Sequence, residues 1–233
     1  IDLDPQGNAS TGLGIGEASR HVSTYDVLAG AAALEQAMTA AGIPGLFVAP
    51  STRDLAGLES EISAAPNRAY FLRDAIASLR ASEADRPSAE RFGYVLIDCP
   101  PSLSILTLNA LAAADAALVP VQCEFFALEG ITQLKQTIDF VRSSLNPSLE
   151  IHGVVLTMHD SRTRLADEVA TEVRTFFGEK VYKTVIPRNT RVAEAPSHGK
   201  PLLLYDHKSA GSRAYVELAA EMIRRERAAA RAA

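Results

Sequence analysis

The chain has 233 residues, of which 47% are hydrophobic and only 6% aromatic, so it can bury one sizeable core built mainly from aliphatic side chains. No apolar run reaches the roughly 18 residues of a membrane-spanning helix, and we recognise no basic-then-apolar leader, so we expect a cytoplasmic protein. The formal net charge of −5 divides unevenly: residues 1–179 hold 12 Lys/Arg and 23 Asp/Glu, whereas residues 180–233 hold 11 and 5. This asymmetry permits a basic face on an acidic protein, although a solvated basic helix at residues 224–231 accounts for part of it.

Short apolar runs alternate with helix-length amphipathic segments along the chain. The runs, which we predict to be strands, are Ile1–Leu3, Leu46–Val48, Tyr94–Ile97, Ala117–Val121, Ile151–Thr157 and Val181–Ile186. Helices are predicted from about residue 127, over residues 165–176 with a stop at Gly178, and from about Ser212. The first of these has an apolar stripe at Ile131, Leu134, Ile138, Val141 and Leu145.

Strands that alternate with helices favour right-handed crossovers and a parallel sheet. We therefore predict an α/β fold with three layers, in which helices cover both faces of a mostly parallel, twisted sheet. We expect residues 1–233 to form a single domain, because no linker or internal repeat interrupts the pattern.

Two of the predicted strands end in acidic residues, and open parallel sheets bind ligands at the carboxyl ends of their strands. Asp2 and Asp4 end the first strand, and Asp98 ends the third. A carboxylate there fits a Walker B role, holding Mg²⁺ directly or through its water, although Asp98 alone is equally consistent with a helix cap or a turn. Pro100 and Pro101 then force an extended exit from the strand, which suits a switch that senses a phosphate.

The first strand leads into residues 4–8, DPQGN, which offer a carboxylate, an amide and a glycine. Such a carboxylate can orient or deprotonate a water in phosphoryl transfer, although the pattern alone is weak. Residues 12–16, GLGIG, look superficially like a dinucleotide-binding fingerprint. They trail the strand by several residues, and Ser19 stands where the third glycine belongs, so we interpret them as a flexible loop.

Two polar segments that follow predicted strands are rich in cations: residues 159–164, HDSRTR, and residues 187–200, PRNTRVAEAPSHGK. Both are consistent with solvated loops, and both are consistent with contacts to the phosphates of a nucleotide or a nucleic acid. No His/Cys/Asp spacing indicates a structural zinc site, and no Ser/His/Asp order indicates acyl transfer.

Taken together, five segments resemble the ParA/Soj family of deviant-Walker ATPases, which partition chromosomes and plasmids. They are DLDPQGNASTGLG at residues 2–14, VLIDCPPSLSILTLNAL at 95–111, VPVQCEFFALEG at 119–130, GVVLTM at 153–158 and KTVIPRNTRVAEAPSHGKPLLLYD at 183–206. The resemblance covers essentially the whole chain and implies the P-loop NTPase fold, with ATP and Mg²⁺ as cofactors.

The resemblance implies a role for each residue of the phosphate site. Asp4 corresponds to the residue that positions or activates the hydrolytic water, and Asp2 lies near the phosphate and the magnesium ion. Asp98 corresponds to the Walker B aspartate, and Pro100 belongs to the switch that follows it.

Further residues are implied for adenine and for DNA. Met158 and the stretch Pro187, Arg188 and Asn189 resemble the segments that border the adenine. Arg162 and Arg191 match positions where the family carries cations for sequence-independent DNA binding, and Lys200 extends that patch. The implied partners are a second copy of the chain in an ATP-dependent homodimer, nucleoid DNA and a ParB-type centromere-binding protein that triggers hydrolysis, with no membrane attachment.

One family feature is missing from the sequence. The family carries a glycine-rich phosphate loop, K-G-G-x-G-K-T-T, in its first strand–loop–helix unit, whereas no G-K-[ST] occurs in these 233 residues. We therefore expect that this unit, about 30 residues, has been removed, that the coding sequence upstream of Ile1 encodes it, and that the chain by itself has negligible ATPase activity.

Three other functions are weighed against a partition ATPase. A non-catalytic DNA- or partner-binding remnant has no physical reason to keep both Asp4 and Asp98. A MinD-like division-site ATPase binds membrane through an amphipathic helix, but the arginines of residues 224–233 face only alanine. A redox ATPase resembling the nitrogenase iron protein needs cysteines clear of the switch, but Cys99 directly follows Asp98.

Overall fold

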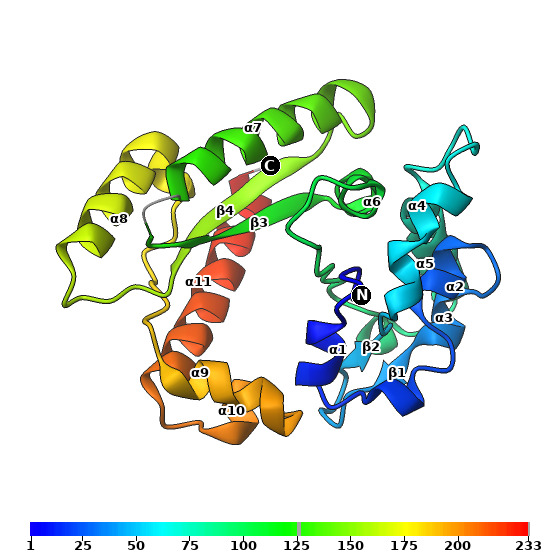
Figure 1. Cartoon of the computed structure of the whole chain (residues 1–233), viewed down its shortest axis with the longest axis horizontal. Coiled ribbons are helices and arrows are strands. Elements are labelled where there is room, and N and C mark those ends of the chain that lie inside the picture. Colours follow the sequence, from blue (N-terminus) through cyan, green and yellow to red (C-terminus); the bar gives the residue numbers. More distant parts are fainter. Residues whose placement is uncertain (125–126, 233) are drawn as a thin grey trace. The chain divides into compact units, whose positions relative to one another are not determined.

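The computed structural model describes residues 1–124 and 127–232, and the chain divides into two compact units (Figure 1). Unit 1 comprises residues 1–115, 140–149 and 196–200, and unit 2 comprises the remaining described residues. The α/β class is confirmed, whereas a single domain over residues 1–233 stays a prediction.

Unit 1 is mainly helical. Its elements are α1 (Asn8–Gly12), α2 (Thr24–Leu28), α3 (Leu34–Ala37), β1 (Thr39–Ala40), β2 (Phe47–Val48), α4 (Leu58–Glu61), α5 (Phe71–Ser82) and α6 (Ile105–Ala113), with 3₁₀ turns at Glu17–Ser19, Arg53–Ala56, Ser88–Glu90 and Ala195–His198, of which the last also includes Ala195 of unit 2. The predicted strand at residues 46–48 is present as β2, but it pairs with β1 in an antiparallel hairpin, Thr39 with Val48 and Ala40 with Phe47.

The predicted first and third strands lie beside each other in unit 1. Asp2 and Asp98 form a parallel bridge, in which the Asp98 N–H donates to the Ile1 carbonyl and the Leu3 N–H donates to the Asp98 carbonyl, both at 2.9 Å. On its other side the Asp2 N–H donates to the Ala49 carbonyl at 3.0 Å. Residues 94–97 form no longer ladder, and Leu96 is 70% exposed, so this segment is less covered than a buried strand should be.

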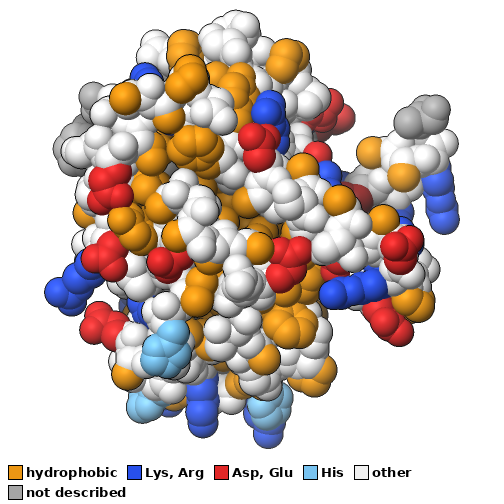
Figure 2. Space-filling view, turned by 90° about the vertical axis from the view of Figure 1, so that its right-hand side faces the viewer, with side chains coloured by type: hydrophobic (Ala, Val, Ile, Leu, Met, Phe, Trp, Pro, Cys, Tyr) orange, Lys and Arg blue, Asp and Glu red, His pale blue; other side chains and the backbone are white. Residues whose placement is uncertain are grey.

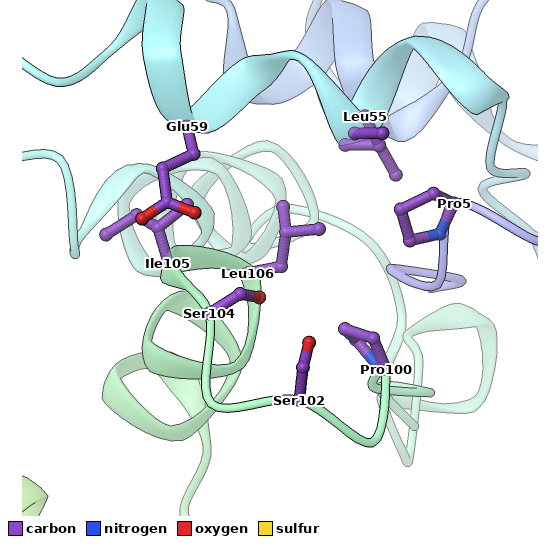
Figure 3. A pocket seen from close by; sticks show the side chains of 9 residues that line it. Pro5, Leu55, Glu59, Pro100, Ser102, Ser104, Ile105 and Leu106 are labelled. Carbon is purple, nitrogen blue, oxygen red and sulfur yellow. The ribbon is translucent and has the colours of Figure 1, made fainter.

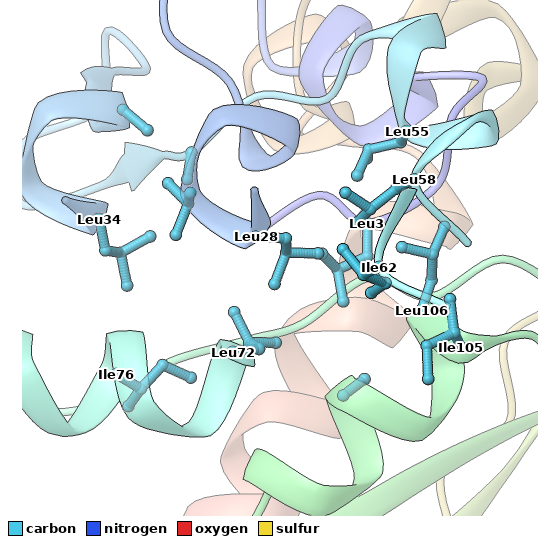
Figure 4. Close-up of a cluster of buried hydrophobic side chains, with 14 of the residues drawn as sticks. Leu3, Leu28, Leu34, Leu55, Leu58, Ile62, Leu72, Ile76, Ile105 and Leu106 are labelled. Carbon is cyan, nitrogen blue, oxygen red and sulfur yellow. The ribbon is translucent and has the colours of Figure 1, made fainter. Parts of the chain in front are cut away.

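The core of unit 1 gathers around Leu3, which is fully buried at the centre of a large aliphatic cluster (Figure 4). The cluster contains leucines and isoleucines of the helices α2 to α6, among them Leu28, Leu34, Leu58, Leu72, Ile76, Ile105 and Leu106. Because Leu3 stands between Asp2 and Asp4, burial of its side chain fixes where these two carboxylates emerge.

Unit 2 is built on a parallel strand pair. Its elements are β3 (Ala116–Gln122), α7 (Ala127–Ser144, whose last five residues belong to unit 1), β4 (Glu150–Thr157), α8 (Arg164–Phe177), a 3₁₀ turn at Gly178–Lys180, α9 (Thr190–Glu194), α10 (Leu202–Tyr205) and α11 (Ala210–Ala232). β3 pairs with β4 from Ala116 opposite Glu150 to Gln122 opposite Thr157. The predicted strand at residues 181–186 lies alongside β4. Val181 forms a parallel bridge with Val154, and the Ile186 N–H donates to the Leu156 carbonyl at 2.9 Å.

Helices cover both faces of this strand pair. Val154 packs into a cluster with Val169 and Val173 of α8, whereas its neighbour Val155 packs into a second cluster with Tyr182 and with Ala214 of α11. Successive strand residues point to opposite faces, so the two clusters lie on opposite sides of β4. In Figure 1, α7 and α8 lie on one side of β3 and β4, and α11 lies on the other. The layered arrangement expected from the sequence is therefore present in unit 2.

The three predicted long helices are confirmed as α7, α8 and α11, and α8 ends at Phe177, directly before the expected stop at Gly178. Ile138 and Val141 of the predicted stripe on α7 are fully buried, whereas the side chain of Ile131 lies outside the described residues. Hydrophobic side chains also gather on the face shown in Figure 2, interspersed with acidic ones. Within the described part of the chain, no helix combines the length and the apolar character needed to cross a membrane.

Candidate functional site

The structure brings the three predicted carboxylates of unit 1 together. Asp2 and Asp98 are bridge partners at the ends of neighbouring strands, and Asp4 follows Asp2 by two residues. Burial, and then the neighbouring carboxylates of Asp2 and Asp4, raise the pKa of Asp98. Burial and the two neighbouring carboxylates thus both disfavour the ionised form of Asp98, which a bound cation would favour.

Asp2 is 1% exposed, and both oxygens of its carboxylate accept hydrogen bonds from the protein. Oδ2 accepts from the N–H of Ser10 at 2.8 Å and from its hydroxyl at 2.6 Å, while Oδ1 accepts from the Asp4 N–H at 3.1 Å. These hydrogen bonds tie the strand end to the helix α1 and fix the backbone of Asp4. Direct binding of Mg²⁺ by Asp2 stays a prediction, and the geometry favours an indirect contribution.

Asp4 begins a tight turn. Its carbonyl accepts from the Gly7 N–H at 2.8 Å, and its own Oδ1 accepts from the Gln6 N–H at 3.0 Å, which closes the turn from both sides of the residue. Among the described residues no donor reaches Oδ2. One carboxylate oxygen of Asp4 is therefore held, and the other is available to a water.

Pro5 and Pro100 follow the two strand ends and line one pocket, together with Leu55 and the hydroxyl-bearing side chains of Ser102 and Ser104 (Figure 3). The pocket measures about 180 Å³, which is smaller than the roughly 300 Å³ at which ligand pockets begin. We therefore do not assign the nucleotide to it. Its position shows that the loop after Asp4 and the loop after Asp98 contact the same space.

The residues predicted to border the adenine lie side by side in unit 2. His159 forms a parallel bridge with Pro187, its N–H donates to the Ile186 carbonyl at 3.1 Å, and the Arg188 N–H donates to the His159 carbonyl at 2.9 Å. Met158, with φ of 53°, is the one non-glycine among the described residues whose backbone is left-handed. Such a conformation is costly for a side chain other than glycine and clusters at functional sites.

The same segment continues into α9. The Asn189 side chain caps the helix by accepting from the Arg191 N–H at 2.8 Å. Its amide group therefore keeps its donor side for a ligand.

The arginines predicted to contact phosphates all have acidic neighbours. Arg162 donates to both oxygens of Asp160, at 2.8 and 2.7 Å, and this pairing lowers the pKa of Asp160. Arg188 pairs with Glu124 at 3.0 Å. Both side chains of the Arg188–Glu124 pair are more than half exposed, so this pair is weak and can exchange for phosphate contacts. The Arg162 side chain is 84% exposed, whereas Asp160 is 18% exposed and holds it through two hydrogen bonds.

Arg191 joins two helices of unit 2. Its guanidinium contacts Glu194 at 2.9 Å and Asp206, which follows α10, at 3.5 Å. Lys200 lies in unit 1, whereas Arg162 and Arg191 lie in unit 2, and the structure therefore leaves the predicted DNA patch as a prediction.

Three buried polar residues near the Asp4 turn could not be identified from the sequence: Arg20, Ser10 and Ser51. The Ser51 hydroxyl donates to the Asp4 carbonyl at 2.5 Å, and its N–H donates to the Ser10 hydroxyl at 3.1 Å. Arg20 contacts the Ser51 carbonyl at 2.9 Å. Serine and a lone arginine in a polar stretch have no distinctive spacing, so only the folded arrangement reveals them.

A metal ion held by protein ligands alone is not supported. In the part of the chain that the structure describes, no group of three or more His, Cys, Asp or Glu side chains is arranged to hold one. Mg²⁺ commonly takes only one or two carboxylates, with phosphates and waters completing its shell. Asp98, whose ionised form is disfavoured by burial and by the carboxylates of Asp2 and Asp4, can supply one carboxylate to such an ion.

A parallel α/β fold with carboxylates at neighbouring strand ends is typical of the class of α/β proteins that bind nucleotides. A family model described as "AAA domain" matches residues 1–151. The chain is 58% identical over 227 residues to the chromosome partitioning protein ParA of Caulobacter vibrioides, covering 97% of this chain and 82% of that protein. It is 46% identical over 222 residues to the sporulation initiation inhibitor protein Soj of Bacillus subtilis, covering 95% and 84%. The chain belongs to the ParA/Soj family of chromosome-partitioning ATPases.

Solved structures agree with the fold. The cobyrinic acid a,c-diamide synthase of Mycobacterium smegmatis, solved with a bound ATP analogue and magnesium, superimposes with a TM-score of 0.80 at 35% identity, covering 96% of this chain and 80% of that one. This likeness confirms the predicted P-loop NTPase class. The identity is well below the 58% shared with the partitioning protein, so the family assignment rests on the latter.

Proposed function

We propose that the protein hydrolyses Mg²⁺-bound ATP and that Asp4 acts on the attacking water. The observation that carries this proposal is the meeting of Asp2, Asp4 and Asp98 at two paired strand ends. Bound Mg²⁺ would neutralise charge that develops on the phosphates. The protein residues supply position: Asp98 would hold the ion directly or through its water, and Asp4 Oδ2 would orient or deprotonate the water.

The nucleotide base would lie against Met158 and residues 187–189, which are held next to each other by hydrogen bonds. Support comes from the hydrogen bonds that place these two strand ends side by side and from the left-handed backbone of Met158. The relative solved with a bound ATP analogue and magnesium has the same fold, which supports both cofactors for this chain.

The finer parts of the proposal concern partners. We assign ATP-dependent pairing of two copies, sequence-independent binding to nucleoid DNA through Arg162, Arg191 and Lys200, and stimulation by a ParB-type centromere-binding protein. Family membership supports these assignments, and so does the excess of basic residues over residues 180–233.

The test uses the protein encoded by the complete reading frame that contains this sequence. Phosphate release should require both ATP and Mg²⁺ and should rise when DNA and the ParB-type partner are added together. Asp98→Asn should weaken Mg²⁺-dependent ATP binding, measured by equilibrium titration with a fluorescent ATP analogue. Hydrolysis that persists in excess chelator, or normal Mg²⁺-dependent binding by Asp98→Asn, would contradict the proposal.

A further inference from the structure

Arg20 is a buried arginine without a carboxylate partner. It is 9% exposed, and among the described residues no acidic side chain lies within ion-pair distance of it. Its guanidinium instead donates to two backbone carbonyls and one hydroxyl: the Ile15 carbonyl at 3.1 and 2.9 Å, the Ser51 carbonyl at 2.9 Å and the Thr11 hydroxyl at 2.7 Å. Removing a guanidinium from water without an opposite charge is unfavourable, so these hydrogen bonds must hold it in place.

The acceptors of Arg20 belong to two segments that flank Asp4. Thr11 of α1 and Ile15, in the loop after α1, lie in the segment of residues 7–15 that follows Asp4, together with the Gly7 carbonyl, a more distant acceptor at 3.4 Å. Ser51 lies in the segment after β2, almost 50 residues away in sequence. One planar side chain with several donors can therefore bridge two segments at fixed geometry, which a lysine cannot do.

The bridge reaches Asp4 through Ser51. Arg20 fixes the Ser51 carbonyl, and the Ser51 hydroxyl donates to the Asp4 carbonyl at 2.5 Å. The remaining backbone contacts of Asp4 are the bond from its N–H to Asp2 and the bond that its carbonyl accepts from Gly7. Among the described residues, the two that donate to the Asp4 carbonyl, Ser51 and Gly7, also accept hydrogen bonds from Arg20 through their own carbonyls.

Gly7 shows how closely the guanidinium approaches the turn. A Cβ at this position would lie 2.3 Å from Arg20 Nη1, and the φ of Gly7 is +64°. A side chain at position 7 would therefore collide with Arg20 as well as strain the backbone.

We propose that Arg20 is a positioning residue for hydrolysis. Through Ser51 and the segment of residues 7–15, it holds the carboxylate of Asp4 in the orientation that acts on water. The inference rests on the proposed role of Asp4. The proposed role acts through Ser51 and requires no contact between Arg20 and the nucleotide. A misplacement of about 1 Å in a reacting group can cost as much as about 100-fold in rate, so loss of the bridge should slow the chemical step.

The test compares Arg20→Lys, which keeps the charge and loses the fork, with Arg53→Lys, a control at an arginine whose side chain is 89% exposed. In the protein from the complete reading frame, Arg20→Lys should lower kcat for ATP hydrolysis about 10- to 100-fold with KM changed less than about threefold. Arg53→Lys should leave both constants unchanged. A normal kcat for Arg20→Lys, or a loss confined to KM, would overturn the inference.

A double-mutant cycle distinguishes positioning of Asp4 from a general loss of structure. In an Asp4→Asn background, Arg20→Lys should cause no further fall in kcat, because both changes remove the same contribution. Equal losses in the two backgrounds would overturn the inference.

Ser51→Ala serves as a second variant if Arg20→Lys does not fold. It keeps the guanidinium and removes the hydroxyl bond to Asp4 together with a longer one, of 3.4 Å, to the Thr52 carbonyl, and it should behave in the cycle in the same way. If Asp4→Asn itself hydrolyses ATP normally, the proposed function fails. If Asp4→Asn is slow but Arg20→Lys and Ser51→Ala are normal, only the positioning role fails.

Discussion

Ser10 donates both its backbone N–H and its hydroxyl to the same oxygen of Asp2, at 2.8 and 2.6 Å. Two donors on one carboxylate oxygen occupy both of its lone pairs. The other oxygen holds the Asp4 N–H. Although Asp2 and Asp4 are only two residues apart, both oxygens of the Asp2 carboxylate accept hydrogen bonds from the protein, whereas one oxygen of Asp4 accepts none from the described residues. Asp2 therefore holds the backbone in place, and Asp4 has an oxygen that can act on a water.

Asp4→Asn should slow ATP hydrolysis about 100- to 10,000-fold, the range that a positioned acid–base group contributes. The amide can still accept from the Gln6 N–H, so the turn should remain and ATP-dependent dimers should still form. Single-turnover phosphate release and size-exclusion chromatography with ATP measure the two properties separately. Asp85→Asn, in the exposed segment of residues 84–87, is the matched control and should change neither. Loss of ATP binding in Asp4→Asn would contradict the role given to Asp4.

Arg191→Gln should weaken retention of DNA about three- to tenfold at moderate salt and lower the slope of affinity against salt concentration by about one, as expected when one phosphate contact is lost. Basal ATP hydrolysis should not fall. Gel shifts over a range of salt concentrations measure the slope. Arg80→Gln removes an equal charge from α5 in unit 1 and should leave the slope unchanged. If both variants weaken binding equally, net charge rather than a contact at Arg191 is responsible.

Glu221 of α11 should stabilise unit 2 in a pH-dependent manner. Burial alone would raise the pKa of Glu221, but hydrogen bonds from the N–H groups of Lys183 and Thr184, from the Thr184 hydroxyl and from Arg225 outweigh it and lower the pKa to about 2. A folded-state pKa below the unfolded value of 4.5 gives stability that is fully present above pH 4.5 and is lost as the pH falls towards 2.

Glu221→Gln should therefore lower the free energy of unfolding by about 2 kcal/mol at pH 7, and the difference should shrink as the pH approaches 2. Urea titrations followed by circular dichroism at several pH values provide the comparison. Glu217→Gln, an exposed change one helical turn earlier, should cost little at any pH. A deficit in Glu221→Gln that is independent of pH would contradict the assigned cause.

Gly153→Ala should destabilise unit 2 by about 1–3 kcal/mol through overpacking. The added Cβ would lie 2.4 Å from the ring of Tyr182 and 3.0 Å from the Lys180 carbonyl. Gly130→Ala, in α7, has no heavy atom within 4 Å of the new methyl group and should instead stabilise the helix by about 0.5–1 kcal/mol. Thermal unfolding of the two variants should therefore shift in opposite directions, and a shift in the same direction would contradict the packing described for β4.

Strands and long helices could be predicted because their signal is local. The stripe that contains Ile138 and Val141 has the period of a helix, and the runs that became β3 and β4 have the length and branching of buried strands. The carboxylates at Asp2, Asp4 and Asp98 could be predicted because parallel strands end at a shared edge.

Contacts to backbone carbonyls could not be predicted, because every residue has a carbonyl and the sequence does not indicate which one a side chain will contact. For this reason the loop at residues 12–16 was expected to be flexible, whereas Ile15 is 5% exposed and packs with Ala41 and Val48. The acidic partners of Arg162 and Arg191 escaped prediction for a similar reason. Asp160 and Glu194 are close in sequence, but nothing in their spacing separates an ion pair from two solvated charges.

The alternation of Val154 and Val155 between two hydrophobic clusters restricts how this chain can change in length. Insertion of a single residue in β4 before Val154 would rotate Val154 and Val155 to the opposite faces, so neither valine would pack into its present cluster. Changes in length should therefore be confined to surface segments such as residues 83–91. Related sequences should align through residues 150–157 without a gap, even where their loops differ.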